Sequence, residues 1–412
     1  MQAQTVITYD HNEKTVLSIE DPIYGLINFL SDESSPSELT FSQLLYKLFQ
    51  SSSAVKRLEG VHQAGAAWLW APNEWNVTRL QHSIGVMLLI RKLAPHDHAQ
   101  QLAGLLHDIS HSAFSHVIDL VLYNTNDDFH DTVVKSYVTA PNHKFKTVKC
   151  SEEDANLSLW NILEEFHMEQ VANVLMEEDH SLKFTLLEMD FPLLCADRID
   201  YTLRDQILYG FYKQIGLTRS DISNIVSAFT TFNKDGEDII MFDVEHLEEA
   251  EKFMKLYKNL VVDYFLGLEN MFMNDALAQL LRLSMQQRII SIDDMIWGDD
   301  DFILETVKGY LNQNSEKDAL ISDLFSIFKE RRWSNELKPI EHYVKVVTSE
   351  EDYDYSPIRK KRFVDFLILG KDKQLENISK CSATALLLFT QMEGQDKQKL
   401  FLKRLVQHCE MK

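Results

Sequence analysis

Ionisable side chains are concentrated in an apolar stretch of this 412-residue chain, LAGLLHDISHSAFSHVID at residues 102–119. The stretch carries His107, Asp108, His111, His116 and Asp119 among leucine, isoleucine, alanine and phenylalanine residues. Burying so many ionisable groups costs free energy unless they bind something. We therefore predict a site here in which a metal ion and a phosphate group meet.

The dipeptide HD occurs three times, at 96–97, 107–108 and 130–131. Only the copy at 107–108 has apolar residues on both sides at helical spacing, which predicts a helix through it. On that helix His111 lies one turn from His107, on the same face. The copy at 96–97 lies in the polar turn APHDHAQ, where we expect it to cap the next helix.

Two other segments supply partners for this dipeptide. TRLQHSIGV at 78–86 carries His82, and LLCADRIDYTLRD at 193–205 carries Asp197. Two imidazoles and two carboxylates suit Mn, Fe, Mg or Zn and leave coordination positions for water and substrate. We therefore predict a divalent metal ion bound by His82, His107, Asp108 and Asp197. The alternative is four hydrogen-bonded polar residues at helix ends.

These segments resemble the HD superfamily of metal-dependent phosphohydrolases, particularly the branch that contains the deoxynucleoside triphosphate triphosphohydrolases. The resemblance covers about residues 18 to 210 and rests on SIEDPIYGLI, VKRLEGVHQAG, TRLQHSIGV, HDISHSAFSH and ADRIDY. Tyr24 stands where the branch usually has histidine. The resemblance implies a mainly α-helical fold, an HD-domain core with small β-hairpins at its periphery.

The resemblance also implies catalytic roles. His111, Asp119 and His130 fall where the family has catalytic groups around the attacked phosphate. His116 resembles the residue that protonates the leaving oxygen. Histidine titrates near neutral pH and suits such proton transfer. The alternative is that these side chains only cap and brace helices.

Five further residues resemble groups that bind substrate. Arg79 and Arg198 resemble cations that contact phosphate, whose geometry a guanidinium matches. Gln63, Tyr201 and Asp205 resemble groups that hold the sugar. Arg79 could instead pair with a nearby carboxylate, and Asp205 could lie on a solvated helix face.

One segment departs from the family pattern. In the triphosphohydrolases a later helix carries an arginine and a tyrosine pair that clamp the triphosphate and the sugar. The corresponding stretch here, residues 248–277, contains no arginine, and valines stand at 261–262 in place of the pair. Substitutes for the clamp are available in Lys252, Lys255, Tyr257 and Lys258.

These patterns favour an enzyme that hydrolyses a nucleotide phosphoester or phosphoanhydride, with a dNTP triphosphohydrolase as one version. A phosphatase or phosphodiesterase that releases orthophosphate or a monophosphate is a second version. The alternatives from other classes are a non-catalytic nucleotide sensor or scaffold, and an oligomer subunit that uses the metal only for stability.

Composition limits the partners. The chain has 63 acidic and 41 basic residues, a net charge of −22, which opposes binding to nucleic acids and anionic membranes. Its four scattered cysteines form no CxxC pair, and it has no apolar run of 18 residues. We expect a cytoplasmic protein with a small-molecule nucleotide substrate. By analogy with the family we also expect a homo-oligomer.

The organisation along the chain follows from periodicity and turn residues. We expect hairpins at 5–19 and 228–242, a polar irregular flap at 124–156, helices from 244 to about 332, and a strand at 342–348. We divide the chain into an HD-domain core with an N-terminal hairpin (1–335) and a small α/β extension packed on it (336–412).

Overall fold

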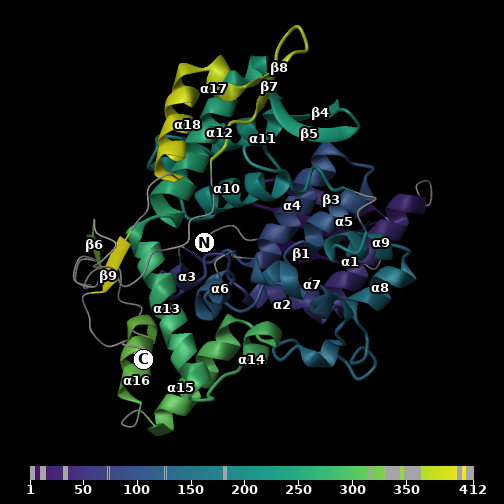
Figure 1. Cartoon of the computed structure of the whole chain (residues 1–412). Helices are drawn as coiled ribbons and strands as arrows, with labels where there is room; N and C mark the ends of the chain where they lie inside the picture. Colours follow the sequence, from purple (N-terminus) through teal and green to yellow (C-terminus); the bar gives the residue numbers. More distant parts are fainter. Residues whose placement is uncertain are drawn as a thin grey trace.

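The computed structural model describes residues 5–9, 15–30, 36–71, 73, 75–124, 126, 128–179, 183–314, 318–329, 344–347, 363–396 and 401–404. Within these residues the molecule is mainly α-helical, with short strands at its edges, as Figure 1 shows. The predicted fold class is confirmed.

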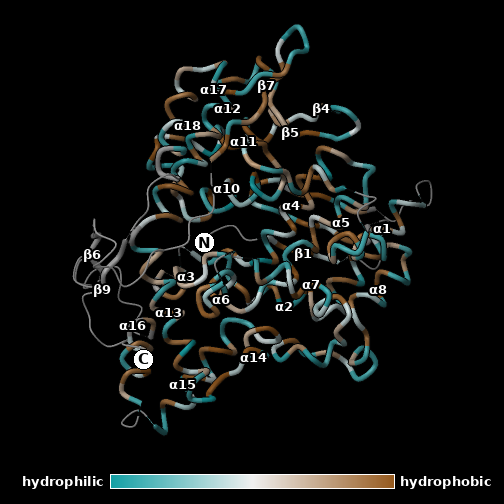
Figure 2. The backbone as a smooth tube through the Cα atoms, in the orientation of Figure 1, coloured by the Kyte–Doolittle hydropathy of each residue, from teal (hydrophilic) through white to brown (hydrophobic). Residues whose placement is uncertain are grey.

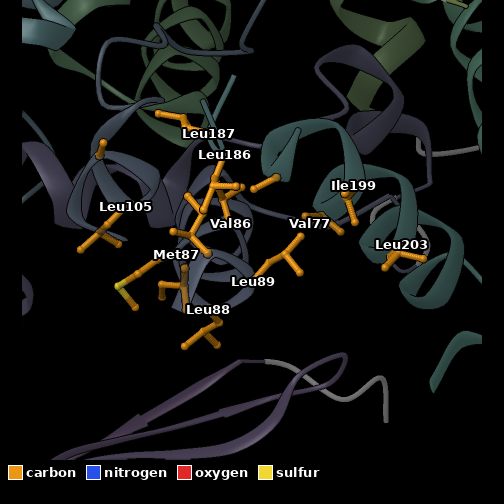
Figure 3. Close-up of a cluster of buried hydrophobic side chains, with 14 of the residues drawn as sticks. Val77, Val86, Met87, Leu88, Leu89, Leu105, Leu186, Leu187, Ile199 and Leu203 are labelled. Atoms are coloured by element: carbon orange, nitrogen blue, oxygen red, sulfur yellow. The ribbon is translucent and has the colours of Figure 1, made fainter. Parts of the chain in front are cut away.

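Three helices form the centre of the fold: α4 (Arg79–Leu93), α5 (His98–Leu106) and α10 (Ala196–Leu208). Residues 82–90 of α4 are all buried, which is the pattern of a helix that other elements surround. In the core shown in Figure 3, α4 contributes residues 86–89, α5 contributes Leu105, and α10 contributes Ile199 and Leu203. A capping box at Thr78 begins α4 and so fixes where His82 lies on it.

The HD dipeptide does not lie inside a helix. Helix α5 ends at Leu106, and His107 is its C-cap. The chain then turns until α6 (Val117–Leu122) begins, with positive φ angles at Phe114 (61°) and Ser115 (56°). The prediction that a helix continues through His107 and places His111 one turn below it is therefore wrong.

A buried arginine explains why this loop is stable without helical hydrogen bonds. The side chain of Arg57 donates hydrogen bonds to the backbone carbonyls of Ile109, at 3.2 Å, and of His111. It also donates to the carbonyl of Gly298 at 3.0 Å and lies over the ring of Tyr137. These contacts satisfy carbonyls that a helix would otherwise have to satisfy.

The N-terminal region forms a three-stranded antiparallel sheet of β1 (Val6–Thr8), β2 (Thr15–Asp21) and β3 (Gly25–Leu30). The predicted hairpin corresponds to β1 and β2, whose connection at 10–14 lies outside the described residues. Strand β3 was not predicted. Helix α1 (Pro36–Ser51) packs on β2 and β3. It is followed by α2 (Ser53–Arg57), η1 (Leu58–Gly60) and α3 (Ala66–Trp70).

The segment predicted as an irregular flap, 124–156, contains helix α7 (Phe129–Thr139) and the 3₁₀ turn η2 (Asn142–Lys144). Val134, Tyr137 and Val138 are buried, and their i, i+3, i+4 spacing is helical. The polar residues between them obscured this short amphipathic pattern. Helices α8 (Leu159–Glu165) and α9 (Glu169–Leu175) follow.

The second predicted hairpin is confirmed as β4 (Phe229–Lys234) and β5 (Glu237–Asp243) around Asp235 and Gly236, both at positive φ. In Figure 2 the loop between these strands is hydrophilic and β5 is hydrophobic. Strands β7 (Leu367–Leu369) and β8 (Leu375–Asn377) extend this sheet in the order β4-β5-β7-β8. Around it lie α11 (Arg219–Ala228), α12 (Leu247–Lys258), α17 (Ile378–Cys381) and α18 (Ala383–Asp396).

A second hydrophobic cluster forms around the long helix α13 (Leu268–Gln286), against which α3, α6 and α16 (Ala319–Lys329) pack. Helices α14 (Ile292–Trp297) and α15 (Asp300–Asn314) complete this part. The strand predicted at 342–348 is present at its centre as β6 (Val344–Val347), which pairs with β9 (Phe401–Arg404). Within the described part of the chain, no helix is long and apolar enough to cross a membrane.

Candidate metal centre

The three central helices bring the predicted ligands together. His82 lies in the first turns of α4, His107 caps the end of α5, and Asp197 lies in the first turn of α10. Nε2 of His82 lies 2.9 Å, and Nε2 of His107 3.7 Å, from Oδ1 of Asp197. The ligand atoms of these three residues all lie within 4.8 Å of one another, a grouping that fits one divalent ion.

Asp108 faces the same space. Its Oδ1 lies 3.4 Å from Nε2 of His107, and its Oδ2 lies 3.8 Å from Nε2 of His82. Burial by itself would raise the pKa of Asp108, but Arg79, His107 and His111 together hold it well below its usual range. The fourth predicted ligand is therefore an ionised carboxylate at the edge of the group.

The ring nitrogens are arranged to leave Nε2 available. Nδ1 of His107 donates to the carbonyl of Gly104 at 2.9 Å, and Nδ1 of His82 lies 2.8 Å from Oδ2 of Asp200. Nε2 of His107 is buried and makes no hydrogen bond to any described residue. A buried nitrogen without a hydrogen bond is costly unless it binds something else, so this set of donors fits a divalent ion.

The electrostatics of the site without an ion point the same way. Burial lowers the pKa of His82, but its hydrogen bonds with Asp197 and Asp200 raise it to about 10. Burial raises the pKa of Asp197, but His107 and His82 hold it far below its usual range. The centre is therefore built to surround a positive charge, which in the absence of metal is a proton.

The predicted catalytic histidines form a second group beside this centre. The rings of His111 and His130 are stacked, with centroids 4.3 Å apart, and His116 meets His111 edge-on at 4.8 Å. Nε2 of His111 lies 3.2 Å from Oδ1 of Asp108, which connects the two groups. Burial and the neighbouring Arg79 lower the pKa of His111 well below its usual range, so it is neutral at pH 7.

Asp119 lies at the edge of this histidine group. Its Oδ1 accepts hydrogen bonds from the side chain of Asn124 at 2.6 Å and from the backbone amide of Phe129 at 3.0 Å. Its Oδ2 lies 3.9 Å from Nδ1 of His116. Asp119 therefore connects α6 to the start of α7, the helix that carries His130.

Arg79 is paired with a carboxylate of the centre. Its Nη1 donates to Oδ2 of Asp108 at 2.7 Å, and its Nε donates to the hydroxyl of Ser115 at 3.0 Å. That hydroxyl in turn donates to the carbonyl of His62 at 2.8 Å. Arg79 thus lies in the cavity wall with its guanidinium already held next to the metal ligands.

Arg198 has different partners. Its guanidinium donates to the carbonyl of Met189 at 3.1 Å and to that of Leu193, and it lies 3.9 Å above the ring of Phe191. It also lines the cavity. The structure therefore brings both predicted phosphate-binding cations to the cavity and gives each of them partners within the protein.

Of the three residues predicted to bind the sugar, two are among the described residues that line the cavity and one is not. Gln63 and Tyr201 line the cavity, and Oε1 of Gln63 is buried without a hydrogen bond from the described residues. Asp205 is fully buried and is not among the described residues that line the cavity. Burial raises the pKa of Asp205 to about 7. Its role in holding a sugar stays a prediction.

The cavity has a volume of about 1330 Å³, above the roughly 300–1,000 Å³ typical of ligand pockets. The described residues that line it include nine aspartates and glutamates but four lysines and arginines. The metal centre and the histidine group form one side. Residues of α13 and of the turn before it form another.

The candidates for a substitute triphosphate clamp lie elsewhere. None of Lys252, Lys255, Tyr257 and Lys258 is among the described residues that line the cavity. Lys252 pairs with Asp221 at 2.8 Å. The π-helical turn η5 (Asn259–Phe265) places both valines at 261–262 in the hydrophobic core.

Sequence reasoning missed a buried aspartate that braces the site. Oδ1 of Asp300 accepts a hydrogen bond from the backbone amide of Phe114 at 2.6 Å, and Oδ2 accepts from the amide of His62 at 2.9 Å. The same Oδ2 lies 2.9 Å from Nδ1 of His62. Asp300 lies in an acidic run, GDDD, that resembles an ordinary helix start, so no local pattern indicated this role.

Comparisons with known sequences agree with this geometry. A family model described as the HD domain matches residues 79–205. An uncharacterised protein of Bacillus subtilis, YdhJ, is 31% identical over 328 residues, which are 79% of this chain and 84% of that protein. The metal-dependent phosphohydrolase cns2 of Cordyceps militaris is 32% identical over 222 residues, which are 54% of this chain and 52% of that protein.

Solved structures share the fold. A phosphohydrolase from Bacteroides thetaiotaomicron superposes with a TM-score of 0.60 at 17% identity, over 94% of this chain and 98% of that chain. A hypothetical protein from Aquifex aeolicus superposes with a TM-score of 0.55 at 19% identity, over 94% of this chain and 95% of that one. At these identities the likeness concerns the fold.

Proposed function

This chain belongs to the HD-domain superfamily of metal-dependent phosphohydrolases, and on that premise we propose that it hydrolyses a nucleotide phosphoester with a single phosphate group in preference to a triphosphate. The products are orthophosphate from a monoester or a nucleoside monophosphate from a diester. The resemblance to nucleotide-hydrolysing enzymes, together with Gln63 and Tyr201 in the cavity wall, supports a nucleotide substrate.

The proposed preference for a substrate with one phosphate group rests on the charge of the cavity wall. Nine carboxylates face four lysine and arginine side chains among the described lining residues. Even if a divalent ion offsets the charge of two of these carboxylates, seven carboxylates remain against four cationic side chains. A triphosphate carries several negative charges that need cationic partners. A single phosphate next to the ion needs far fewer.

The four cations of the wall are already engaged. Arg79 pairs with Asp108, Lys183 pairs with Glu237, and Arg198 and Arg282 donate to backbone carbonyls. Binding a polyphosphate would break several of these contacts, and losing the hydrogen bonds of buried Arg79 would cost more than losing the exposed Lys183–Glu237 pair. This pairing supports the same preference.

The protein side chains act in the reaction by orientation and proton transfer. A divalent ion held by the four ligands His82, His107, Asp108 and Asp197 would polarise a phosphoryl oxygen and lower the pKa of its water. Arg79, next to Asp108, offers positive charge to the phosphate, and neutral His111, whose Nε2 lies 3.2 Å from Oδ1 of Asp108, orients that carboxylate. As water attacks phosphorus and the bond to the leaving oxygen breaks, His116 donates a proton to that oxygen.

A hydrolysis panel tests the proposal. Metal-replete protein is incubated with nucleoside mono-, di- and triphosphates, cyclic nucleotides and dinucleotides, and the products are identified. We expect faster turnover of monophosphates or diesters, with orthophosphate or a monophosphate as product. Release of tripolyphosphate at the highest rate would contradict the preference for one phosphate. Tight nucleotide binding with no turnover of any substrate would favour the sensor alternative.

A further inference from the structure

We propose that Asp200, Arg204 and Asp21 form a buried chain of positioning residues that sets how tightly His82 holds the metal ion. The inference deepens the proposed function, because it rests on the same metal centre. It assigns a role to the turn between β2 and β3, whose residues are not among the described residues that line the cavity.

The chain begins at the metal ligand. Oδ2 of Asp200 lies 2.8 Å from Nδ1 of His82, on the side of the ring away from the ligand atom Nε2. His82 and Asp200 are 1% and 0% exposed. A carboxylate that accepts the Nδ1 proton of a ligating histidine fixes the tautomer and ring orientation and makes Nε2 a stronger donor to a metal.

Arg204 holds the carboxylate in place. Its Nε lies 2.9 Å from Oδ2 of Asp200 and its Nη2 lies 3.0 Å from Oδ1, a two-pronged contact one helical turn along α10. The geometry fixes both the position and the plane of the Asp200 carboxylate. A buried carboxylate without such a partner would be costly to keep ionised.

The N-terminal sheet completes the chain. Nη1 of Arg204 donates to Oδ2 of Asp21 at 3.0 Å, at the end of β2. Oδ1 of Asp21 accepts from the backbone amides of Ile23 and Tyr24, which shapes the turn into β3. That turn directs the hydroxyl of Tyr24 to Oδ1 of Asp200 at 2.9 Å. The turn thus reaches Asp200 directly through Tyr24 and indirectly through Asp21 and Arg204.

Gly85 on α4 supports this assignment independently. Glycine is among the poorest helix formers, and this one lies in a helix interior without a positive φ. A Cβ atom added there would lie 1.9 Å from Nη2 of Arg204 and 2.1 Å from Oδ1 of Asp200. The absence of a side chain at residue 85 is what gives the paired groups room beside His82.

The first test uses the variant Asp200→Asn. The asparagine keeps the size of the side chain and an oxygen acceptor for His82 but removes the negative charge. We measure the Kd of Mn²⁺ by chelator competition and expect it to rise about 10- to 100-fold. At saturating Mn²⁺ we expect most of the turnover to return, with the KM for substrate unchanged. The matched control is Asp365→Asn, a buried carboxylate that binds Ser379 in another part of the fold, with a Kd within twofold of wild type.

The second test compares two helical glycines. Gly85→Ala pushes a methyl group into the Arg204–Asp200 pair and should raise the Kd of Mn²⁺ at least tenfold. Gly309→Ala on α15, where an added Cβ meets nothing within 4 Å of it in the described structure, should leave the Kd unchanged. The visible absorption of the Co²⁺-loaded proteins should change for the variant at residue 85 only.

The outcomes separate this inference from the proposed function. Folded variants at residues 200 and 85 that bind Mn²⁺ as tightly as wild type overturn the positioning chain. A weaker Mn²⁺ affinity in both variants supports it, even if no nucleotide phosphoester is hydrolysed by the wild-type protein. If the wild-type protein hydrolyses no nucleotide phosphoester, the proposed function is refuted, but the proposed positioning role is still supported.

Discussion

The two sides of the cavity differ in how firmly their side chains are held. On the metal side, His82, Asp108 and His111 are at most 5% exposed, and each has a charged partner within 3.2 Å. The side formed by η5 and α13 offers partly exposed amide and apolar groups, such as Asn270, Met271 and Asn274.

This difference suggests that the metal side performs the catalysis and that the α13 side recognises the substrate. Catalysis depends on donors held at fixed positions before substrate arrives, so the metal side needs many buried contacts. The α13 side only has to match a substrate surface, and polar groups there contact one another: Nδ2 of Asn274 donates to Oδ1 of Asn270 at 3.2 Å. We expect changes on the metal side to abolish turnover and changes on the α13 side to alter substrate preference.

The largest effect is expected from His107→Ala or Asp108→Ala. Each removes a donor from the centre, so bound metal and turnover should be lost together, the latter by about a thousandfold or more. Metal content and hydrolysis rates of the purified proteins measure this. His246→Ala, an exposed histidine in the turn η4 (Val244–His246), is the matched control. Undiminished hydrolysis in the His107 variant would refute the assigned centre.

Metal affinity should depend strongly on pH. The pKa of His82 in the metal-free protein is raised to about 10, so its proton is bound at pH 7 and must leave when the ion binds. The Kd of Mn²⁺ should therefore fall about tenfold per pH unit from pH 6 to 8. Calorimetry in buffers of different ionisation enthalpy should detect at least one proton released; none released would mean that Nε2 of His82 does not bind the ion.

Asp300→Asn probes the loop between α5 and α6. Removing the charge weakens the contacts to the amide of Phe114 and to His62, and should lower the free energy of unfolding by about 1–3 kcal/mol. The loop carrying His116 should lose alignment, so we expect kcat to fall roughly tenfold while the Kd of Mn²⁺ stays within twofold. An unchanged kcat in a destabilised variant would show that Asp300 serves stability alone.

The smallest effect is expected on the α13 side. Met271→Lys adds a cation to the cavity, and should raise kcat/KM for a triphosphate relative to a monophosphate by roughly fivefold, since an exposed ion pair contributes about 1 kcal/mol. Met271→Leu keeps the apolar character and should leave the ratio as in wild type. Equal ratios in both variants would show that charge in this wall does not govern preference.

Much of the site was accessible from the sequence because short-range patterns encode it. The donors His82, His107, Asp108 and Asp197 were identified by residue type and order, and the structure brings them together. The two hairpins and the helices after residue 244 followed from periodicity and turn residues. These features depend on neighbours within a few positions, which a single sequence displays directly.

Other features depend on contacts between distant residues. The loop after Leu106 is not helical because Arg57, about fifty residues earlier, binds its carbonyls. The sequence made Lys252 a candidate for binding phosphate. In the structure it pairs instead with Asp221 of α11.

The sequence by itself determined the ligand types, their order and the helical class of the fold, since these follow from local chemistry, from periodicity and from motifs that resemble a known family. Only the tertiary structure decided that Asp205 is buried outside the cavity wall, that Asp300 braces the loop carrying His116, and that the wall cations are already paired. The physical reason is that a side chain's partners are chosen by packing, which brings together groups far apart in the chain and buries them where each charge requires a neighbour.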